Sequence, residues 1–206
     1  MNKCFAKILI IFAVITSLAS HSEAAEQTAV FAGGCFWGVE SVFEHVKGVT
    51  AVRSGYAGGT KKSANYDDVS SGNTKHAEAV EIRFDPAKIA YEQLLYVFFA
   101  VAHDPTEVNR QGPDVGSQYR SVIFFANDKQ KKLAKRFILA IETSKAFKKP
   151  IATELAPFVA FFAAEDYHQD YLKKNPTDPY IIAHDLPKLR ALKEKFPELY
   201  KSEPSA

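Results

Sequence analysis

The order of the apolar segments along the chain constrains the fold more strongly than any other feature. A short apolar run at 28–32 predicts a buried strand that two glycines end. Apolar residues then recur at helical spacing from 36 to 46, and a second strand pattern follows at 49–56. The same strand–helix–strand order repeats at 78–84, 89–102 and 119–125. This repetition is typical of the split βαβ arrangement. We therefore expect an α+β fold, namely a ferredoxin-like two-layer sandwich with a mixed sheet.

The rest of the chain extends this core. Residues 61–74 and 103–117 are polar and predict loops. We expect a helix at 128–147, further strand at 151–162, a helix at 165–174 and a last helix at 185–196. Asp185 is placed to cap that last helix, and Pro187 suits its first turn. The fold should therefore carry additional C-terminal helices.

The strand at 78–84 contains an unusual carboxyl group. Val80, Ile82 and Phe84 share one face, and Glu78 is in phase with them. A carboxyl on the core side costs free energy unless it is neutral or hydrogen-bonded, and burial raises its pKa. A neutral glutamic acid can act as a general acid. The alternative is that Glu78 lies at the strand end and turns toward water.

Length and charge limit the class of protein. The chain has 206 residues, of which 47% are hydrophobic, and its net charge is +2. Such a chain can form one soluble domain with a substantial core, and we assign that domain to 25–206, with a core at 28–176 and a helical tail at 177–206. The nearly balanced charge gives no reason to expect nucleic acid or an anionic membrane as a partner.

The first 24 residues differ from the rest. Two lysines precede an apolar run at 8–19, and Ser22 and Ala24 supply the small residues of a cleavage site. This pattern predicts a secretory signal peptide at 1–24, hence export across the inner membrane to the periplasm. A retained membrane anchor is the alternative, although the run is shorter than the roughly 20 residues that a span needs. Cleavage would remove Cys4 and leave Cys35 as the only thiol.

Cys35 lies in the stretch GGCFWG, at a predicted strand-to-helix turn. Backbone N–H groups at the start of a helix favour a thiolate, so the position suits a reactive cysteine. The alternative is an inert cysteine in the core. A Cys–His acyl transferase would need His76, His103 or His168, but none of them lies in a local signature of that chemistry. One thiol and scattered histidines give no zinc spacing, so we expect no metal and no cofactor.

Three polar residues in or near loops are weaker candidates. The hydroxyl groups of Tyr66 and Tyr119 could reach a polar atom of a substrate, although each is explained as well by packing. Asp114 is most simply a turn residue.

A series of motifs carries a family resemblance. They are GGCFWG at 33–38, GYAGG at 55–59, Tyr66 with GNTKHAEAV at 72–80, HDPT at 103–106, NRQG at 109–112, GSQYRS at 116–121 and AEDYHQDYL at 164–172. In this order they resemble the A-type peptide methionine sulfoxide reductases, which act on the S epimer of the sulfoxide. The match covers about 28–176.

The resemblance implies a role for each site residue. Cys35 would be the nucleophile, and Phe36 and Trp37 would form the pocket for the S-methyl group. Glu78 would protonate or hydrogen-bond the sulfoxide oxygen, helped by Tyr66 and Tyr119. Asp114 would bind substrate, although Pro113 stands where relatives often have Asn. Cys35 would end as a sulfenic acid, with methionine as product.

The tail departs from the family pattern, because no cysteine follows Cys35. Many relatives carry later cysteines that resolve the sulfenic acid. We therefore expect an external thiol to recycle Cys35: a thioredoxin-like protein, a glutaredoxin or a low-molecular-weight thiol. Substrates would be oxidised-methionine peptides and proteins or free methionine sulfoxide, and we expect a monomer. A one-cysteine peroxidase, a Cys–His transferase and a non-enzymatic binder of oxidised methionine remain the alternatives.

Overall fold

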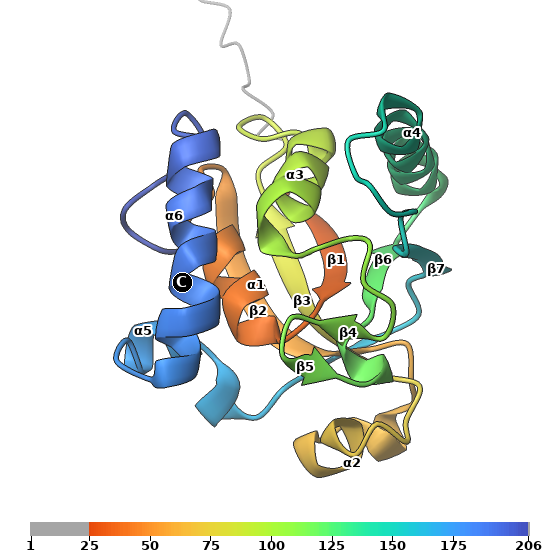
Figure 1. Cartoon of the computed structure of the whole chain (residues 1–206), viewed down its shortest axis with the longest axis vertical. Helices are drawn as coiled ribbons and strands as arrows, with labels where there is room; N and C mark the ends of the chain where they lie inside the picture. The colour runs from red at the N-terminus through yellow and green to blue at the C-terminus, as the bar shows by residue number, and fades with distance from the viewer. Residues whose placement is uncertain (1–24, 206) are drawn as a thin grey trace, which may run out of the picture.

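The computed structural model describes residues 25–205, so the predicted signal peptide lies outside the described residues. Six strands form one sheet in the order β7-β6-β1-β3-β2-β8 (Figure 1). The strands are β1 (Gln27–Gly33), β2 (Val49–Ala57), β3 (Ala77–Phe84), β6 (Ser121–Phe125), β7 (Glu154–Pro157) and β8 (Phe161–Ala163).

The topology confirms the ferredoxin-like prediction. The central strands follow the order β6-β1-β3-β2, and every neighbouring pair among them is antiparallel. Strand β7 extends one edge in parallel with β6, and β8 extends the other edge antiparallel to β2. The parallel β6–β7 pair makes the sheet mixed, as expected.

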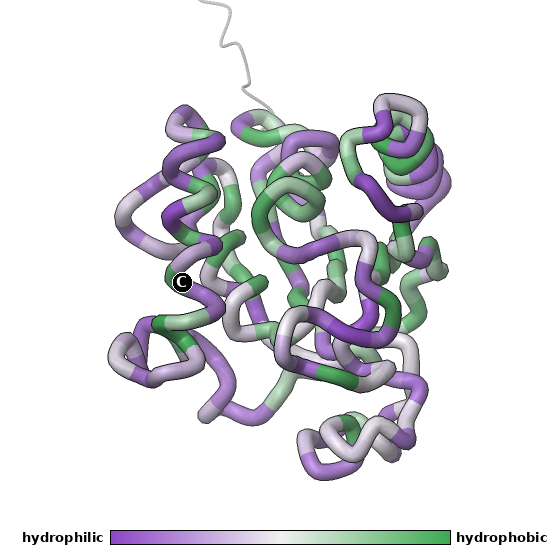
Figure 2. Tube along the Cα trace, viewed as in Figure 1, coloured by the Kyte–Doolittle hydropathy of each residue, from purple (hydrophilic) through white to green (hydrophobic). Residues whose placement is uncertain are grey.

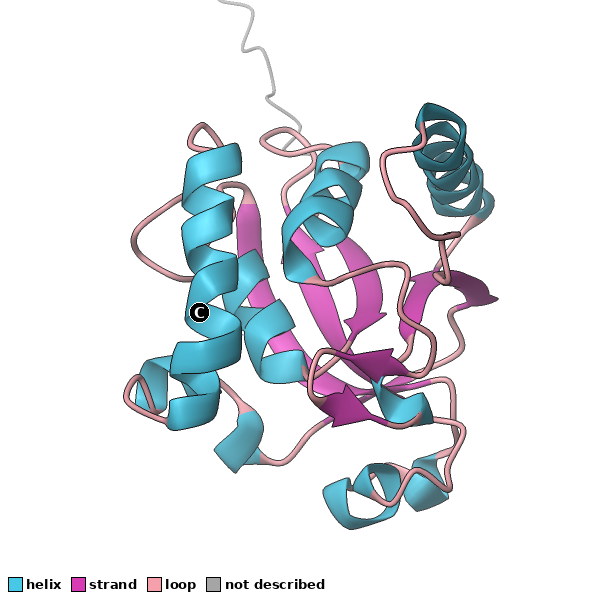
Figure 3. Ribbon diagram, viewed as in Figure 1, coloured by secondary structure: helices cyan, strands magenta, loops and turns pink. Residues whose placement is uncertain are grey.

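The helices lie mainly over one face of the sheet (Figure 3). They are α1 (Phe36–Glu44), α2 (Tyr66–Ser70), α3 (Tyr91–Val97), α4 (Asp128–Ser144), α5 (Tyr171–Lys174) and α6 (Leu186–Lys195). Helix α1 crosses from β1 to β2, and α3 with the π-helical turn η2 (Phe98–Ala102) precedes β6. The final helix α6 runs alongside α1 (Figure 1).

The main core lies between the sheet and these helices. Phe31 of β1 stacks on Phe98 at 4.8 Å between ring centroids, and Phe43 of α1 and Phe84 of β3 are fully buried beside them. Figure 2 shows hydrophobic segments along the strands and mostly hydrophilic ones on the outer turns of α4 and α6. The alternation predicted for β3 is confirmed, since its apolar residues from Val80 to Phe84 have no exposed surface.

Several local predictions were wrong. The segment 61–74 is not only loop, because it contains the turn η1 (Lys61–Ser63) and helix α2. The loop 103–117 contains a short hairpin of β4 (Arg110–Gln111) and β5 (Asp114–Val115). Tyr119 belongs to the turn η3 (Ser117–Tyr119) rather than to the following strand.

The C-terminal helices also differ in detail. Asp170 has a φ of 52° and separates the turn η4 (Asp166–His168) from α5, where one helix was expected. The π-helical turn η5 (Ile181–Asp185) leads into α6. Pro187 is in the first turn of α6, as predicted, but Asp185 provides no side-chain cap. Its carboxyl is instead fully buried against α1. In the described range 25–205, no helix is long and apolar enough to cross a membrane.

Candidate active site

Cys35 lies where β1 turns into α1 and is the N-cap residue of that helix. Gly34 permits the turn, because its φ is 95°, a conformation that strains other residues. A Cβ on Gly34 would also lie 2.5 Å from Gln111 of β4, so the hairpin packs directly against the turn. Cys35 is free and only 8% exposed. The turn therefore holds a thiol at the start of a helix, under the β4–β5 hairpin.

Glu78 reaches the same helix start from β3. The backbone N–H of Phe36, the residue after Cys35, donates to Glu78 Oε2 at 3.1 Å. The glutamate is 2% exposed, so its side chain does not turn toward water. Burial raises the pKa of Glu78 to about 8, although the Phe36 N–H opposes that rise. Glu78 is thus a largely protonated carboxyl beside the thiol at neutral pH.

Burial also raises the pKa of the Cys35 thiol well above its usual value. The nearby charges of Glu78 and Asp185 raise this pKa further, while the Trp37 N–H and Lys188 lower it. The expected stabilisation by the helix start is therefore present but is outweighed by burial. Cys35 rests as a thiol, and a thiolate must be formed by substrate binding or by local charges.

An aromatic cluster of Phe36, Trp37, Tyr171 and Tyr180, called the aromatic wall below, flanks the thiol. Trp37 is stacked on Tyr171, with centroids 3.6 Å apart and planes within 6°. Its indole N–H donates to His168 Nδ1 at 3.1 Å, and Tyr180 meets it edge-on. Phe36, fully buried, lies 5.0 Å from the His168 ring. These contacts fix the two rings that follow Cys35 in one orientation.

The structure brings the remaining predicted residues to the same place. Tyr66 begins α2 and packs against His168, and Tyr119 ends η3. Burial raises the pKa of both tyrosines, and the charges of Glu78, Asp114 and Cys35 raise them further, so both hydroxyl groups stay protonated near these acids. Asp114 accepts a hydrogen bond from the Tyr180 hydroxyl, which ties the β4–β5 hairpin to the tail. Asp114 is therefore more than a turn residue.

Sequence reasoning missed several residues of this site. Glu165 accepts hydrogen bonds from the Tyr56 hydroxyl and from the Tyr66 N–H, both at the site's edge. His168 was examined only as a transferase base, yet it orients Trp37. Tyr171 and Tyr180 lie in a segment whose place in the fold the sequence pattern did not predict. For His168 and Tyr171, the spacing of aromatic residues within AEDYHQDYL was the one available signal.

All three histidines have partners other than Cys35, and His168 is hydrogen-bonded to the Trp37 indole. His103 is bound to the Phe98 carbonyl and the Ser121 hydroxyl, and burial lowers its pKa to about 4. His76 contacts the Thr60 carbonyl. Their ring nitrogens do not reach Cys35, which disfavours a Cys–His transferase.

No group of three or more His, Cys, Asp or Glu residues within 25–205 is placed to hold a metal ion. A cavity of about 750 Å³ lies between the start of α3 and the start of α4 and is lined by none of the predicted site residues.

Comparison with known proteins agrees with this geometry. Residues 27–200 match the family model described as "Peptide methionine sulfoxide reductase". The chain is 53% identical over 177 residues to peptide methionine sulfoxide reductase MsrA 2 of Synechocystis sp., covering 86% of the chain and 83% of that protein. It is 54% identical over 178 residues to MsrA 2 of Mesorhizobium japonicum, covering 86% of the chain and 91% of that protein.

Solved structures show the same fold. Reduced Mxr1 from Saccharomyces cerevisiae superposes with a TM-score of 0.67 at 35% identity, over 75% of this chain and 88% of that chain. Methionine sulfoxide reductase A of Corynebacterium diphtheriae gives a TM-score of 0.65 at 31% identity, over 76% of this chain and 78% of that chain.

Proposed function

The chain belongs to the A-type peptide methionine sulfoxide reductase family and is an oxidoreductase, and we propose that it reduces the S epimer of methionine sulfoxide by direct attack of Cys35. The observation that carries this proposal is the pairing at the start of α1. A buried carboxyl with a pKa of about 8 shares the first turn of that helix with the only thiol of residues 25–205. A thiol and a neutral acid are the two groups that the reaction requires.

The aromatic wall supplies the binding site for the substrate's sulfur substituents. Phe36 and Trp37 present apolar surface beside Cys35, and Tyr171 holds Trp37 by stacking. An S-methyl group fits such a surface because burial of apolar area is favourable. The hydroxyl groups of Tyr66 and Tyr119 and the carboxyl of Glu78 then face the sulfoxide oxygen. This arrangement places the sulfoxide sulfur toward Cys35 and the sulfoxide oxygen toward these hydroxyl and carboxyl groups.

The reaction transfers one oxygen atom. The sulfur of Cys35 attacks the sulfoxide sulfur, which carries partial positive charge, while Glu78 gives its proton to the oxygen. The thiol proton of Cys35 restores the proton of Glu78, so no net proton is gained or lost. The hydroxyl group then passes to the sulfur of Cys35 as the S–O and S–S bonds of the substrate sulfur break, so methionine leaves and Cys35 becomes a sulfenic acid. Tyr66 and Tyr119 stabilise the negative charge that builds on the oxygen before it is protonated.

Turnover then needs a reductant from outside the chain. The tail that follows the site, from η5 through α6, contains no cysteine. An external thiol would attack the sulfenic sulfur of Cys35, release water and form a mixed disulfide, and a second thiol would release Cys35. A thioredoxin-like protein, a glutaredoxin or a low-molecular-weight thiol would serve.

Three further parts of the proposal rest on sequence or on family resemblance. Peptides, proteins and free methionine sulfoxide are all proposed as substrates, because the thiol lies at a site that needs only the sulfoxide and its methyl group. Export to the periplasm rests on the leader pattern at 1–24. The monomeric state is proposed from the absence of any sequence feature that points to self-association.

A single turnover without reductant tests the reaction. The protein is mixed with peptides that contain either resolved sulfoxide epimer, and methionine is quantified together with the mass of the Cys35 peptide. About one equivalent of methionine from the S epimer, with one oxygen added to Cys35, is expected. Cys35→Ser should give none, and it separates chemistry from binding.

Other outcomes favour the alternatives. No methionine from either epimer would refute the reductase proposal, and binding of the sulfoxide peptide that survives in Cys35→Ser would then favour a binder. Oxidation of Cys35 by peroxide, without reaction with sulfoxide, would instead favour a one-cysteine peroxidase.

A further inference from the structure

A buried ion pair in the tail lies at the same helix start and has no place in the reaction described above. Lys188 Nζ donates to Asp185 Oδ1 at 3.1 Å. The Asp185 side chain has no exposed surface, and that of Lys188 is 18% exposed. A pair this far from water is expensive to bury, so its retention calls for a specific partner or role.

The pair rests on the first turn of α1. A Cβ on Gly38 would lie 2.0 Å from Asp185 Oδ1 and 2.7 Å from Lys188 Nζ. Gly38 is three residues after Cys35, hence about one helical turn away. Glycine is therefore required here for the two charged atoms to reach the helix. The tail, which Figure 1 shows running alongside α1, thus delivers its charges to the reactive end of that helix.

The charges that surround Cys35 are otherwise acidic. Two carboxyl groups face Cys35, Glu78 from β3 and Asp185 from η5. Four tyrosines from other segments also face it: Tyr66 of α2, Tyr119 of η3, Tyr171 of α5 and Tyr180, which precedes η5. Asp114 of the hairpin faces Glu78 and Asp185. Lys188 supplies a positive charge that lowers the pKa of Cys35, and this effect is smaller than the opposing effect of Asp185.

The aspartate is only partly neutralised. Its Oδ2 is buried and has no hydrogen-bond partner, and burial raises the pKa of Asp185 although Lys188 opposes that rise. Asp185 therefore holds the ammonium group in place while it retains a charge that disfavours a thiolate. The two members of the pair act on Cys35 in opposite directions.

We infer that Lys188, held by Asp185, is the positioning residue that stabilises the anionic form of Cys35 from the tail side. Its ammonium group rests on the first turn of α1 and acts through the thiol, not on the substrate. This role adds to the proposed function, and its importance for catalysis rests on that function.

The test measures the ionisation of Cys35 directly. Full-length protein is alkylated with iodoacetamide over a range of pH, and the Cys35 peptide is followed by mass spectrometry so that Cys4 does not interfere. Lys188→Met keeps most of the side chain's volume without its charge, and we expect alkylation about tenfold slower at a fixed pH, because one nearby charge shifts a pKa by about one unit. Lys188→Arg should stay within about twofold of the wild type, since it keeps the charge.

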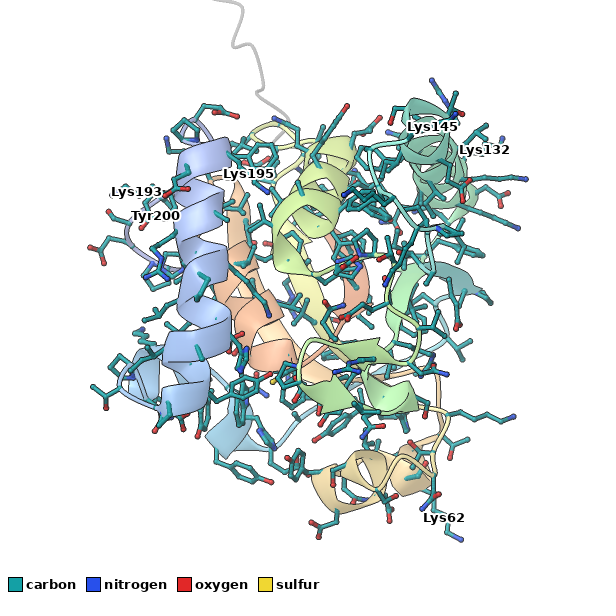
Figure 4. All side chains as sticks on the ribbon, in the orientation of Figure 1. Lys62, Lys132, Lys145, Lys193, Lys195 and Tyr200 are labelled. Atoms are coloured by element: carbon teal, nitrogen blue, oxygen red, sulfur yellow. The ribbon has the colours of Figure 1, made fainter. Side chains whose placement is uncertain are left out.

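Asp185→Asn should change the alkylation rate of Cys35 in the opposite direction. It removes a negative charge and releases the ammonium group toward Cys35, so alkylation should be about threefold faster. The matched control is Lys193→Met, the same change on the same helix. Lys193 is labelled at the outer side of α6 in Figure 4, where it lies over the Tyr200 ring. It should leave the profile unchanged.

A merely structural pair predicts a different pattern. If Lys188 and Asp185 only held the tail in place, both Lys188→Met and Asp185→Asn would expose Cys35 and accelerate alkylation. That result, or an unchanged pH profile in Lys188→Met, would overturn the inference. The alkylation contains no sulfoxide, so its outcome is independent of whether the single-turnover test of the proposed function succeeds.

Discussion

Two buried glutamates have nearly the same pKa but different surroundings: Glu40 belongs to α1, and Glu78 of β3 packs against the start of that helix. Glu78 contacts the start of the helix, and Glu40 lies four residues further along it. Both are 2% exposed, and burial raises the pKa of each to about 8. A raised pKa therefore does not by itself distinguish a catalytic acid from a structural one.

Their hydrogen bonds separate the two. Both oxygens of Glu40 are occupied, because the Ser54 N–H donates to Oε1 at 3.1 Å and the Asp170 N–H donates to Oε2 at 3.0 Å. Glu40 thus connects α1 to β2 and to the start of α5. Glu78 receives one N–H on Oε2, and among residues 25–205 its Oε1 has no hydrogen bond. Glu78 therefore keeps one carboxyl oxygen free to donate a proton, whereas both oxygens of Glu40 are occupied.

The largest expected effect is on catalysis at Glu78. Glu78→Gln keeps the shape and a hydrogen-bond donor but cannot give a proton, so we expect turnover to fall by about 10²–10³-fold. Wild-type turnover should also fall as the pH rises through about 8, because the acid must be protonated to act. Steady-state assays with an S-sulfoxide peptide over a range of pH measure both effects.

Glu40→Gln is the matched control for that experiment. It changes an equally buried glutamate that does not face the thiol, so turnover should stay within about threefold. A loss at Glu40 as large as the loss at Glu78 would show that the distinction between the two sites is wrong.

The second effect is on stability at Glu40. Its folded-state pKa of about 8 lies above the ordinary value of 4.5, so the folded protein binds more protons than the unfolded chain between these values. The contribution of Glu40 to stability is present below about pH 4.5 and is lost as the pH rises through about 8. Relative to wild type, Glu40→Gln should therefore become more stable by about 5 kcal/mol between about pH 4 and pH 9.

Denaturant unfolding at a series of pH values measures this difference. Glu194→Gln is the control, since Glu194 is exposed on α6 and its substitution should give the same pH dependence as wild type. If Glu40→Gln also follows the wild-type pH dependence, the glutamate is not protonated in the folded protein.

The smallest expected effect is on stability at Gly38, which lies in α1 between the helix start that Glu78 contacts and Glu40. Gly38→Ala would push a methyl group into Asp185 and Lys188, which overpacks the tail side and leaves the hydrogen bonds of both glutamates unchanged. We expect a net loss of about 1 kcal/mol, because overpacking costs more than the helix propensity of alanine returns. Thermal unfolding measures it, and a more stable Gly38→Ala would mean that the ion pair does not rest on the helix.

The central fold was predictable because its signals are local. Apolar residues of β3 from Val80 to Phe84 alternate with more exposed charged ones, and the glycines after β1 mark the turn that carries Cys35. The same alternation placed Glu78 in the core. Glu40 was not predicted, although the same logic applies to it, since it lies four residues after Phe36 and three before Phe43, on the buried face of α1.

The missed features depend on contacts between distant segments. Asp185 looks like a helix cap in sequence, yet tertiary packing buries its carboxyl against Gly38, which no local pattern reports. The roles of Tyr171 and Tyr180 depend on where the tail folds back over Trp37. The pKa of Cys35 was predicted from the helix start alone, and the depth of burial reversed its direction. The roles proposed for the site residues, the domain limits and the export of the protein stay predictions.

The most direct test of the central claim is the protonation state of Glu78 itself. Infrared difference spectra of reduced wild type against Glu78→Gln, at about pH 7, isolate the carbonyl stretch of one carboxyl group, and spectra against Glu40→Gln assign the second. The account predicts a protonated carboxyl band for Glu78 that disappears as the pH rises through about 8. Carboxylate bands alone at about pH 7 would contradict it, because an ionised Glu78 could not give a proton to the sulfoxide oxygen.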